Sequence, residues 1–298
     1  MASLYTQQQK NIRRTYLLFS AFFIFIIGIG WVFSYYFDSQ YILYFAVIFS
    51  IISSFISYWY SDKIALAMSH AVPVKSKEQN PYLWNMVENL CITAGLPMPK
   101  LYIIPENQIN AFATGRNPKN AAIAVTEGAL SKLENEELEG VLAHELAHIG
   151  NRDILVSTIA VVLAGIISIL SDFFLRMTFW GGGNRDRNNN GIFMLIGIVL
   201  AILAPIGATL IQLAISRKRE FLADATGALL TRYPEGLIRA LEKIQKDASP
   251  MRVASDATAH LWISNPFKNK MSGFHKLFMT HPPIEERIKA LKGLDISR

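Results

Sequence analysis

Two histidines and one glutamate stand in the order H-E-x-x-H within residues 139–168, which read EGVLAHELAHIGNRDILVSTIAVVLAGIIS. On a helix, His144 and His148 are four residues apart and project from one face, which is the separation that lets two imidazoles bind one metal ion. Glu145 stands beside them, where its carboxylate can reach a water molecule at the metal without becoming a ligand. The pattern therefore predicts a zinc site of the hydrolytic kind.

The third ligand of this site has to come from another part of the chain. A hydrolytic zinc site has three protein ligands and one position open to water, and after His148 the chain continues IGNRDI without a further histidine at a suitable spacing. The later segment SRKREFLADATGA offers Glu220 as a ligand and, four residues on, Asp224 on the same helical face. Asp224 can hold the second ring nitrogen of a ligand histidine. The alternative for Glu220 is an ion pair with the neighbouring arginines.

Composition places this site next to a membrane. Of the 298 residues 51% are hydrophobic and only 17% are charged, against about 25% charged residues in typical soluble domains. A helix needs about 20 apolar residues to cross a bilayer. Four segments approach or exceed this length and predict membrane helices, at residues 15–37, 39–61, 154–175 and 192–215. The third and fourth include polar residues, so a re-entrant or protein-covered arrangement is the alternative for them.

The basic residues near the ends of these segments predict the orientation. Lysines and arginines precede the first segment and follow the second and fourth, at Lys10, Arg13, Arg14, Lys63, Lys75, Lys77, Arg217, Lys218 and Arg219. By the positive-inside rule, both termini and the segments around the histidines face the cytoplasm, although Arg176, Arg185 and Arg187 count weakly against this. The net charge of +6 gathers at these sites, which favours anionic lipid over nucleic acid as the partner. The single cysteine, Cys91, excludes an internal disulfide.

The predicted fold is α+β: a mainly helical integral membrane protein with four membrane helices and a cytoplasmic zincin-like domain that holds a small β-sheet. A helix is expected at 80–96, short strands at 100–104, 110–115 and 120–127, and amphipathic helices near the C-terminus. The predicted parts are an N-terminal tail and membrane hairpin (1–61), a first cytoplasmic part (62–153), a second membrane pair with a mobile loop at 177–191 (154–216), and a second cytoplasmic part (217–298).

Several motifs together resemble a known family. HELAH followed by GNRD, the later REFLADATGA, the upstream NAFATG and two membrane hairpins resemble the HtpX family of integral-membrane zinc peptidases and, more distantly, the CAAX prenyl proteases. The resemblance implies that one zinc ion is held by His144, His148 and Glu220, that Glu145 is the catalytic glutamate, and that Asp224 supports a ligand. It also implies that the strand from Asn110 lies beside a peptide substrate, which would add to Ala111, Phe112, Ala113 and Thr114 as a further strand.

The predicted function is a zinc endopeptidase that cleaves misfolded or damaged membrane proteins at the cytoplasmic face of a bacterial plasma (inner) membrane, in quality control and stress response. Asn110 and His281 are candidates for the side chain that stabilises the oxyanion. The alternatives are a CAAX-type prenyl-protein protease and a non-enzymatic scaffold whose zinc is closed by four protein ligands. The sequence does not indicate an oligomeric state.

Overall fold

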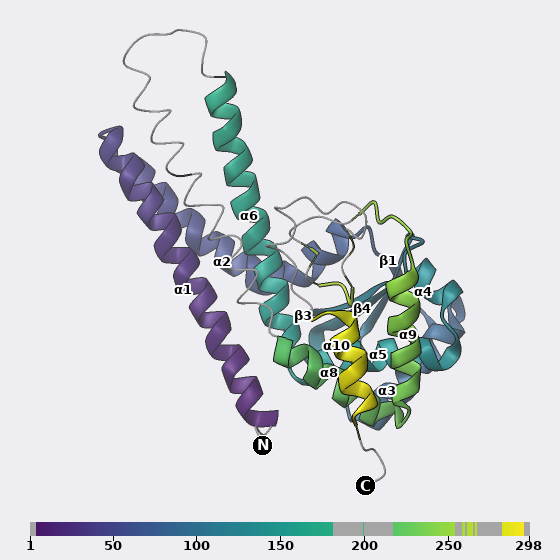
Figure 1. Ribbon diagram of the computed structural model, residues 1–298. Helices are drawn as coiled ribbons and strands as arrows, with labels where there is room; N and C mark the ends of the chain where they lie inside the picture. Colours follow the sequence, from purple (N-terminus) through teal and green to yellow (C-terminus); the bar gives the residue numbers. More distant parts are fainter. Residues whose placement is uncertain are drawn as a thin grey trace.

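Three long helices lie together on one side of the molecule (Figure 1). The computed structural model describes residues 4–180, 199, 217–253, 258–259, 261–264, 266 and 282–294. Helices α1 (Leu4–Tyr36) and α2 (Gln40–Met68) form a hairpin, and α6 (Asp153–Trp180) packs against both. Small residues at the contact between α1 and α2 allow this close packing, because a Cβ atom added to Gly30 of α1 would lie 2.3 Å from the Cβ atom of Ala46 of α2.

Two of these helices can cross a membrane on their own. Thr15–Tyr35 within α1 and the whole of α2 are long and apolar enough, and they correspond to the first two predicted membrane segments. A third span is counted among the described residues only if α5 (Asn135–Gly150) and α6 are taken as one pair bent by 89°. The predicted fourth segment lies outside the described residues except for Val199, which is buried in a cluster with residues of α1 and α6.

Two predicted boundaries differ from the structure. Helix α2 continues to Met68 instead of ending near residue 61, because the sequence after Ser61 contains no glycine or proline until Pro73. Helix α6 runs to Trp180 and takes up the first residues of the predicted mobile loop, because the sequence contains no glycine or proline between Gly165 and Gly181. The remainder of that loop, residues 181–191, lies outside the described residues.

A four-stranded mixed sheet forms the centre of the globular part. Its order is β1 (Val72–Val74), β2 (Lys100–Ile104), β4 (Ala121–Thr126), β3 (Ala111–Gly115). Strand β2 pairs with β4 in parallel, and β1 and β3 pair antiparallel with their neighbours, so β3 stands at one edge. Every residue of β3 and β4 is buried, which indicates that both faces of the sheet are covered.

Alternate side chains of the strands enter two different cores. Leu101, Ile123 and Val125 face one side, where α3 (Pro81–Ala94) and α5 pack. Ile104, Phe112 and Ala124 face the other side, against the end of α2 and against Leu261 and Trp262. Helices α8 (Arg217–Thr231) and α9 (Pro234–Lys246) pack against α5, and α10 (Ile284–Lys292) packs against α8 and α9. Helix α4 (Glu127–Lys132) follows β4 directly, and short 3-10 turns lie at η1 (Lys77–Gln79) and η2 (Pro118–Asn120).

Candidate metal centre

Helix α5 carries both histidines and the glutamate in the middle of the globular part. Its first turn is fixed by a reciprocal capping box between Glu134 and Glu137. The helix is packed between α8, α9 and β3, so His144 and Glu145 are only 1% and 2% exposed. Such burial fixes the side-chain positions and removes most of the water around them.

Helix α8 lies directly against α5 and brings in the acidic residues. Gly227 makes the close contact possible, because a Cβ atom at this position would lie 3.0 Å from the backbone nitrogen of His144. Glu220 and Asp224 lie on the same face of α8 as Gly227 and are both buried.

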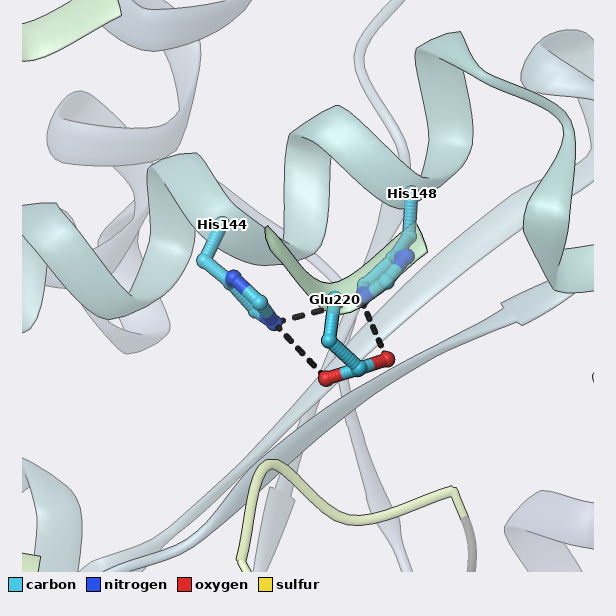
Figure 2. A group of neighbouring side chains, drawn as sticks. All are labelled: His144, His148 and Glu220. Carbon is cyan, nitrogen blue, oxygen red and sulfur yellow. Dashed lines mark hydrogen bonds and ion pairs between the residues drawn. The ribbon is translucent and has the colours of Figure 1, made fainter. Parts of the chain in front are cut away.

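The three side chains His144, His148 and Glu220 converge on one point (Figure 2). The two Nε2 atoms are 3.1 Å apart. Glu220 approaches both of them, with Oε2 3.8 Å from His144 Nε2 and Oε1 3.5 Å from His148 Nε2. Two imidazole nitrogens and one carboxylate therefore surround a common centre.

Each histidine is held from behind by a second carboxylate. Asp224 Oδ1 lies 2.9 Å from His144 Nδ1, and Asp153 Oδ2 lies 3.2 Å from His148 Nδ1. Contacts of this kind set the tautomer, so that Nε2 of each ring is left to face the centre.

A buried arginine completes the arrangement. Arg287 of α10 is 0% exposed and makes a bidentate ion pair with Asp224, with Nε to Oδ2 at 2.8 Å and Nη2 to Oδ1 at 2.6 Å. Its Nη1 donates to the backbone carbonyl of Ile263 at 3.1 Å. Arg287 thereby links the carboxylate behind His144 to the segment 261–264.

Burial and charge shift the pKa values in this cluster in opposite directions. Burial raises the pKa of Glu145 to about 7, and the negative charge of Glu220 adds to the rise. Burial lowers the pKa of His144 to about 4, whereas His148 is raised to about 9, because its hydrogen bond with Asp153 and the nearby carboxylates outweigh burial. A carboxyl group with a pKa near 7 is suited to take up and release a proton at neutral pH.

A small cavity of about 30 Å³ opens beside the cluster. It is lined by polar residues of the cluster and by apolar residues from β3, α6 and the segment 261–264, namely Ala113, His144, Glu145, His148, Asp153, Ile154, Ser157, Glu220, Leu261 and Ile263. By this measure a water molecule needs roughly 10–15 Å³, so the cavity has room for two or three.

The sequence model that defines peptidase family M48 matches residues 77–295 of this chain, which include every residue of this cluster. The chain belongs to peptidase family M48. It is 49% identical over 300 residues to a protease HtpX homolog of Thermoanaerobacter pseudethanolicus, with 98% of both chains covered. It is 44% identical over 304 residues to one of Listeria monocytogenes serovar 1/2a, covering 98% of this chain and all of the relative.

The fold also resembles that of a solved structure. Ste24p of S. mikatae matches with a TM-score of 0.50 at 19% identity, over 97% of this chain. The matched part is 66% of the Ste24p chain, so this chain spans about two thirds of that protein. The resemblance to the HtpX family is thus confirmed, and this M48 member is an integral membrane metallopeptidase that acts on proteins.

The geometry of the cluster fits the metal that M48 membership implies, which is typically zinc. A tetrahedral zinc ion with Zn–N and Zn–O distances of about 2.0–2.2 Å separates its ligand atoms from one another by roughly 3.3 Å. The ligand atoms of His144, His148 and Glu220 lie within 4.8 Å of one another, with separations of 3.1, 3.5 and 3.8 Å between the closest pairs. Small movements of these side chains are sufficient to close them around one ion.

The other predicted site residues occupy different positions. Asn110 is fully buried, and its amide group donates to Gln108 Oε1 at 3.0 Å and to the Ser264 carbonyl at 3.2 Å. Its side chain therefore fixes the backbone of another segment and does not line the cavity. Of the predicted substrate strand, Ala113 lines the cavity and its backbone N–H faces the Glu145 carboxylate. His281 lies outside the described residues.

Two residues of the cluster were not predicted from the sequence. Asp153 is part of the GNRD motif but follows the end of helix α5, and Arg287 is part of HPPIEER, far along the chain. The turn between α5 and α6 explains the first case: Arg152 has a left-handed φ of 57°, and the chain bends there by 89°. This bend directs Asp153 back towards His148.

We expect the exchange Asp153→Asn to weaken metal binding without removing a ligand. Loss of the negative charge beside His148 Nδ1 makes the imidazole a weaker ligand for the metal. Such carboxylate partners contribute roughly 10–100-fold to metal affinity. The dissociation constant for zinc, measured by competition with a chelating dye, should rise by about this factor. Asp38→Asn is the matched control, because Asp38 is exposed in the turn between α1 and α2. Equal zinc affinities of the two variants would contradict the assigned role.

Proposed function

We propose that this protein is a zinc endopeptidase that cleaves misfolded or damaged membrane proteins at the cytoplasmic face of a bacterial plasma (inner) membrane, in the stress response. The observation that carries the proposal is the cluster of His144, His148 and Glu220, which lies beside the buried Glu145 near the start of α6. These three residues are the proposed zinc ligands, one ion per chain. Asp224 and Asp153 are proposed to orient the histidines.

Glu145 is the proposed catalytic residue. Zinc, when bound, supplies a Lewis acid that polarises the substrate carbonyl and makes water more acidic. Glu145 accepts a proton from the attacking water and then delivers it to the nitrogen of the leaving amine as the peptide bond breaks. Its pKa of about 7 supports both steps, because either protonation state is accessible at neutral pH. Asn110 and His281 stay as predictions for the oxyanion contact.

The proposed membrane arrangement has four spans, with α6 as the third and residues 192–215 as the fourth. His148 and Asp153 lie where α5 meets α6, and Glu220 follows the fourth predicted span closely. Both spans therefore have to end at the same membrane surface for the ligands to meet. Basic residues at the span ends support a cytoplasmic position for this surface, for both termini, and for the parts 62–153 and 217–298.

The proposal is tested on the full chain purified in detergent. We expect about one zinc ion per chain by mass spectrometry of the metal, and cleavage of casein that 1,10-phenanthroline lowers at least tenfold. Zinc added after removal of the chelator should restore cleavage. Cleavage that persists in metal-free protein would exclude the proposed mechanism.

The same preparation separates this function from its alternatives. A prenyl-protein protease prefers a farnesylated C-terminal peptide to an unfolded membrane protein, so both are offered at equal concentration. A zinc-stabilised scaffold cleaves neither. X-ray absorption would then find four protein ligands and no water at the zinc.

A further inference from the structure

The edge of the sheet beside the candidate metal centre, strand β3, is covered by another segment of the chain. Segment 261–264, sequence LWIS, runs along β3 in the opposite direction. The backbone N–H of Ile263 donates to the carbonyl of Ala111 at 3.0 Å. On one side of this bond the ring of Trp262 meets that of Phe112, with centroids 4.9 Å apart, and on the other side Ser264 contacts Asn110. The contacts thus follow the register of an added antiparallel strand.

The side chains that hold this segment form hydrogen bonds with its backbone. Asn110 Oδ1 accepts from the Ser264 N–H at 3.3 Å, and Asn110 Nδ2 donates to the Ser264 carbonyl at 3.2 Å. Arg287 Nη1 donates to the carbonyl of Ile263 at 3.1 Å. Backbone groups are the same in any peptide, so a peptide of almost any sequence can make these contacts.

The apolar side chains of the segment pack into the two cores, but within the described part of the chain two of its polar side-chain atoms are unpaired. Trp262 is fully buried, but its Nε1 has no hydrogen-bond partner among the described residues, and the same holds for the Ser264 hydroxyl. An unpaired buried polar group opposes burial. The two unpaired polar atoms therefore oppose burial of the segment, whereas the backbone groups of Ile263 and Ser264 are paired.

The remaining backbone groups at the outer edge of β3 also contact other parts of the chain. The Thr126 N–H donates to the Asn110 carbonyl, and in an antiparallel pair every second residue is hydrogen-bonded to the partner strand. Phe112 and Thr114 therefore bond to β4. The backbone groups of Ala111, Ala113 and Gly115 point away from β4. The backbone N–H of Ala113 faces the Glu145 carboxylate, and the Gly115 nitrogen lies 3.4 Å from Thr158 Oγ1 of α6. A peptide cannot add to this strand while these contacts persist. The cavity of about 30 Å³, with room for two or three water molecules, is likewise too small for an extended peptide of several residues.

We infer that segment 261–264 is an internal pseudosubstrate, which occupies the groove for the substrate backbone and has to leave β3 before a peptide can bind. The inference rests on the proposed peptidase function. Because the segment is tethered, it competes at a high effective concentration, and only an extended, unfolded chain offers the same backbone groups. Folded proteins would therefore leave the groove closed, which gives the site a preference for unfolded substrates without a sequence motif.

A reversible cross-link tests this inference. Ala111→Cys and Ile263→Cys are combined with Cys91→Ala, since hydrogen-bonded antiparallel partners have Cα atoms about 5.5 Å apart, within the range of a disulfide. In a Glu145→Gln background, binding of a fluorescein-labelled casein peptide is measured by anisotropy before and after oxidation. Mass spectrometry verifies the cross-link, and the two single-cysteine variants are treated in the same way as controls.

We expect the oxidised protein to bind the peptide at least tenfold more weakly than the reduced protein, with no change in the controls. Equal affinities of the cross-linked and reduced forms would overturn the inference and leave the peptidase function standing. If the reduced protein does not bind the peptide and the native chain cleaves no casein, the proposed function fails, and the inference fails with it.

A second pair of variants is used if the cross-link does not form. Ile263→Pro removes the N–H that donates to Ala111, whereas Ile263→Ala shortens the side chain and keeps this donor. The loss of one backbone hydrogen bond should free the groove and lower the dissociation constant of the peptide about fivefold relative to Ile263→Ala. Equal or weaker binding by the proline variant would contradict the inference.

Discussion

The variant Glu145→Gln is expected to lose peptide cleavage by about a thousandfold or more while it keeps its zinc. Glutamine has nearly the shape of glutamate but cannot accept a proton, and one group that acts as base and then as acid contributes on the order of 10²–10⁴-fold in rate. The side chain of Glu145 is buried beside the ligand cluster but is not one of the three converging groups. Zinc content should therefore stay at about one ion per chain, as measured by mass spectrometry of the metal.

The matched control for this change is Glu136→Gln on the same helix, because the Glu136 side chain is 53% exposed. It should cleave casein at the rate of the native chain. A Glu145→Gln protein that retains zinc and cleaves within tenfold of the native rate would show that another group moves the proton. If the variant loses zinc as well, Glu145 acts in metal binding, contrary to its proposed role.

Local patterns were sufficient to predict the helix with the two histidines and most of the sheet. The histidines need only helical spacing, and the strands at 100–104, 110–115 and 120–127 agree with β2, β3 and β4 to within a residue at each end. Strand β1 was not predicted, because it has three residues with Pro73 in the middle, a combination that occurs at sheet edges and carries a weak signal. Glu220 was predicted from the coordination chemistry of zinc, which requires a third ligand, and the structure places it next to the two histidines.

The residues that the sequence did not indicate act through contacts between distant parts of the chain. Arg287 is 143 residues from His144, and Ile263 is 152 residues from Ala111. The pattern of a single segment cannot predict such a pair, because the contact forms only when α8, α10 and the sheet pack together. Asn110 is a related case: it was predicted as a substrate contact, but its residue type did not indicate that its amide holds the backbone of Ser264, 154 residues away.

Asp224 joins the two halves of this system, because it contacts His144 on one side and Arg287 on the other. The guanidinium beside it holds the pKa of Asp224 at about 2 although burial opposes this, so the carboxylate stays charged behind the histidine. Arg287 also grips the Ile263 carbonyl. The position of the proposed metal ligand His144 and that of segment 261–264 therefore depend on one buried cation.

Replacement of this cation, Arg287→Met, is expected to destabilise the globular part by about 3–5 kcal/mol. The exchange leaves the buried Asp224 carboxylate without its partner, which is far more costly than the loss of an exposed ion pair. At about 2–4 °C per kcal/mol for a domain of this size, the midpoint of thermal unfolding in detergent should fall by on the order of 10 °C.

Arg287→Lys keeps the charge but not the bidentate fork, so its midpoint should lie between those of Arg287→Met and the native chain. The double variant Arg287→Met with Asp224→Asn removes both charges and should be more stable than Arg287→Met alone. Equal midpoints for Arg287→Met and the native chain would mean that the ion pair does not hold the site together.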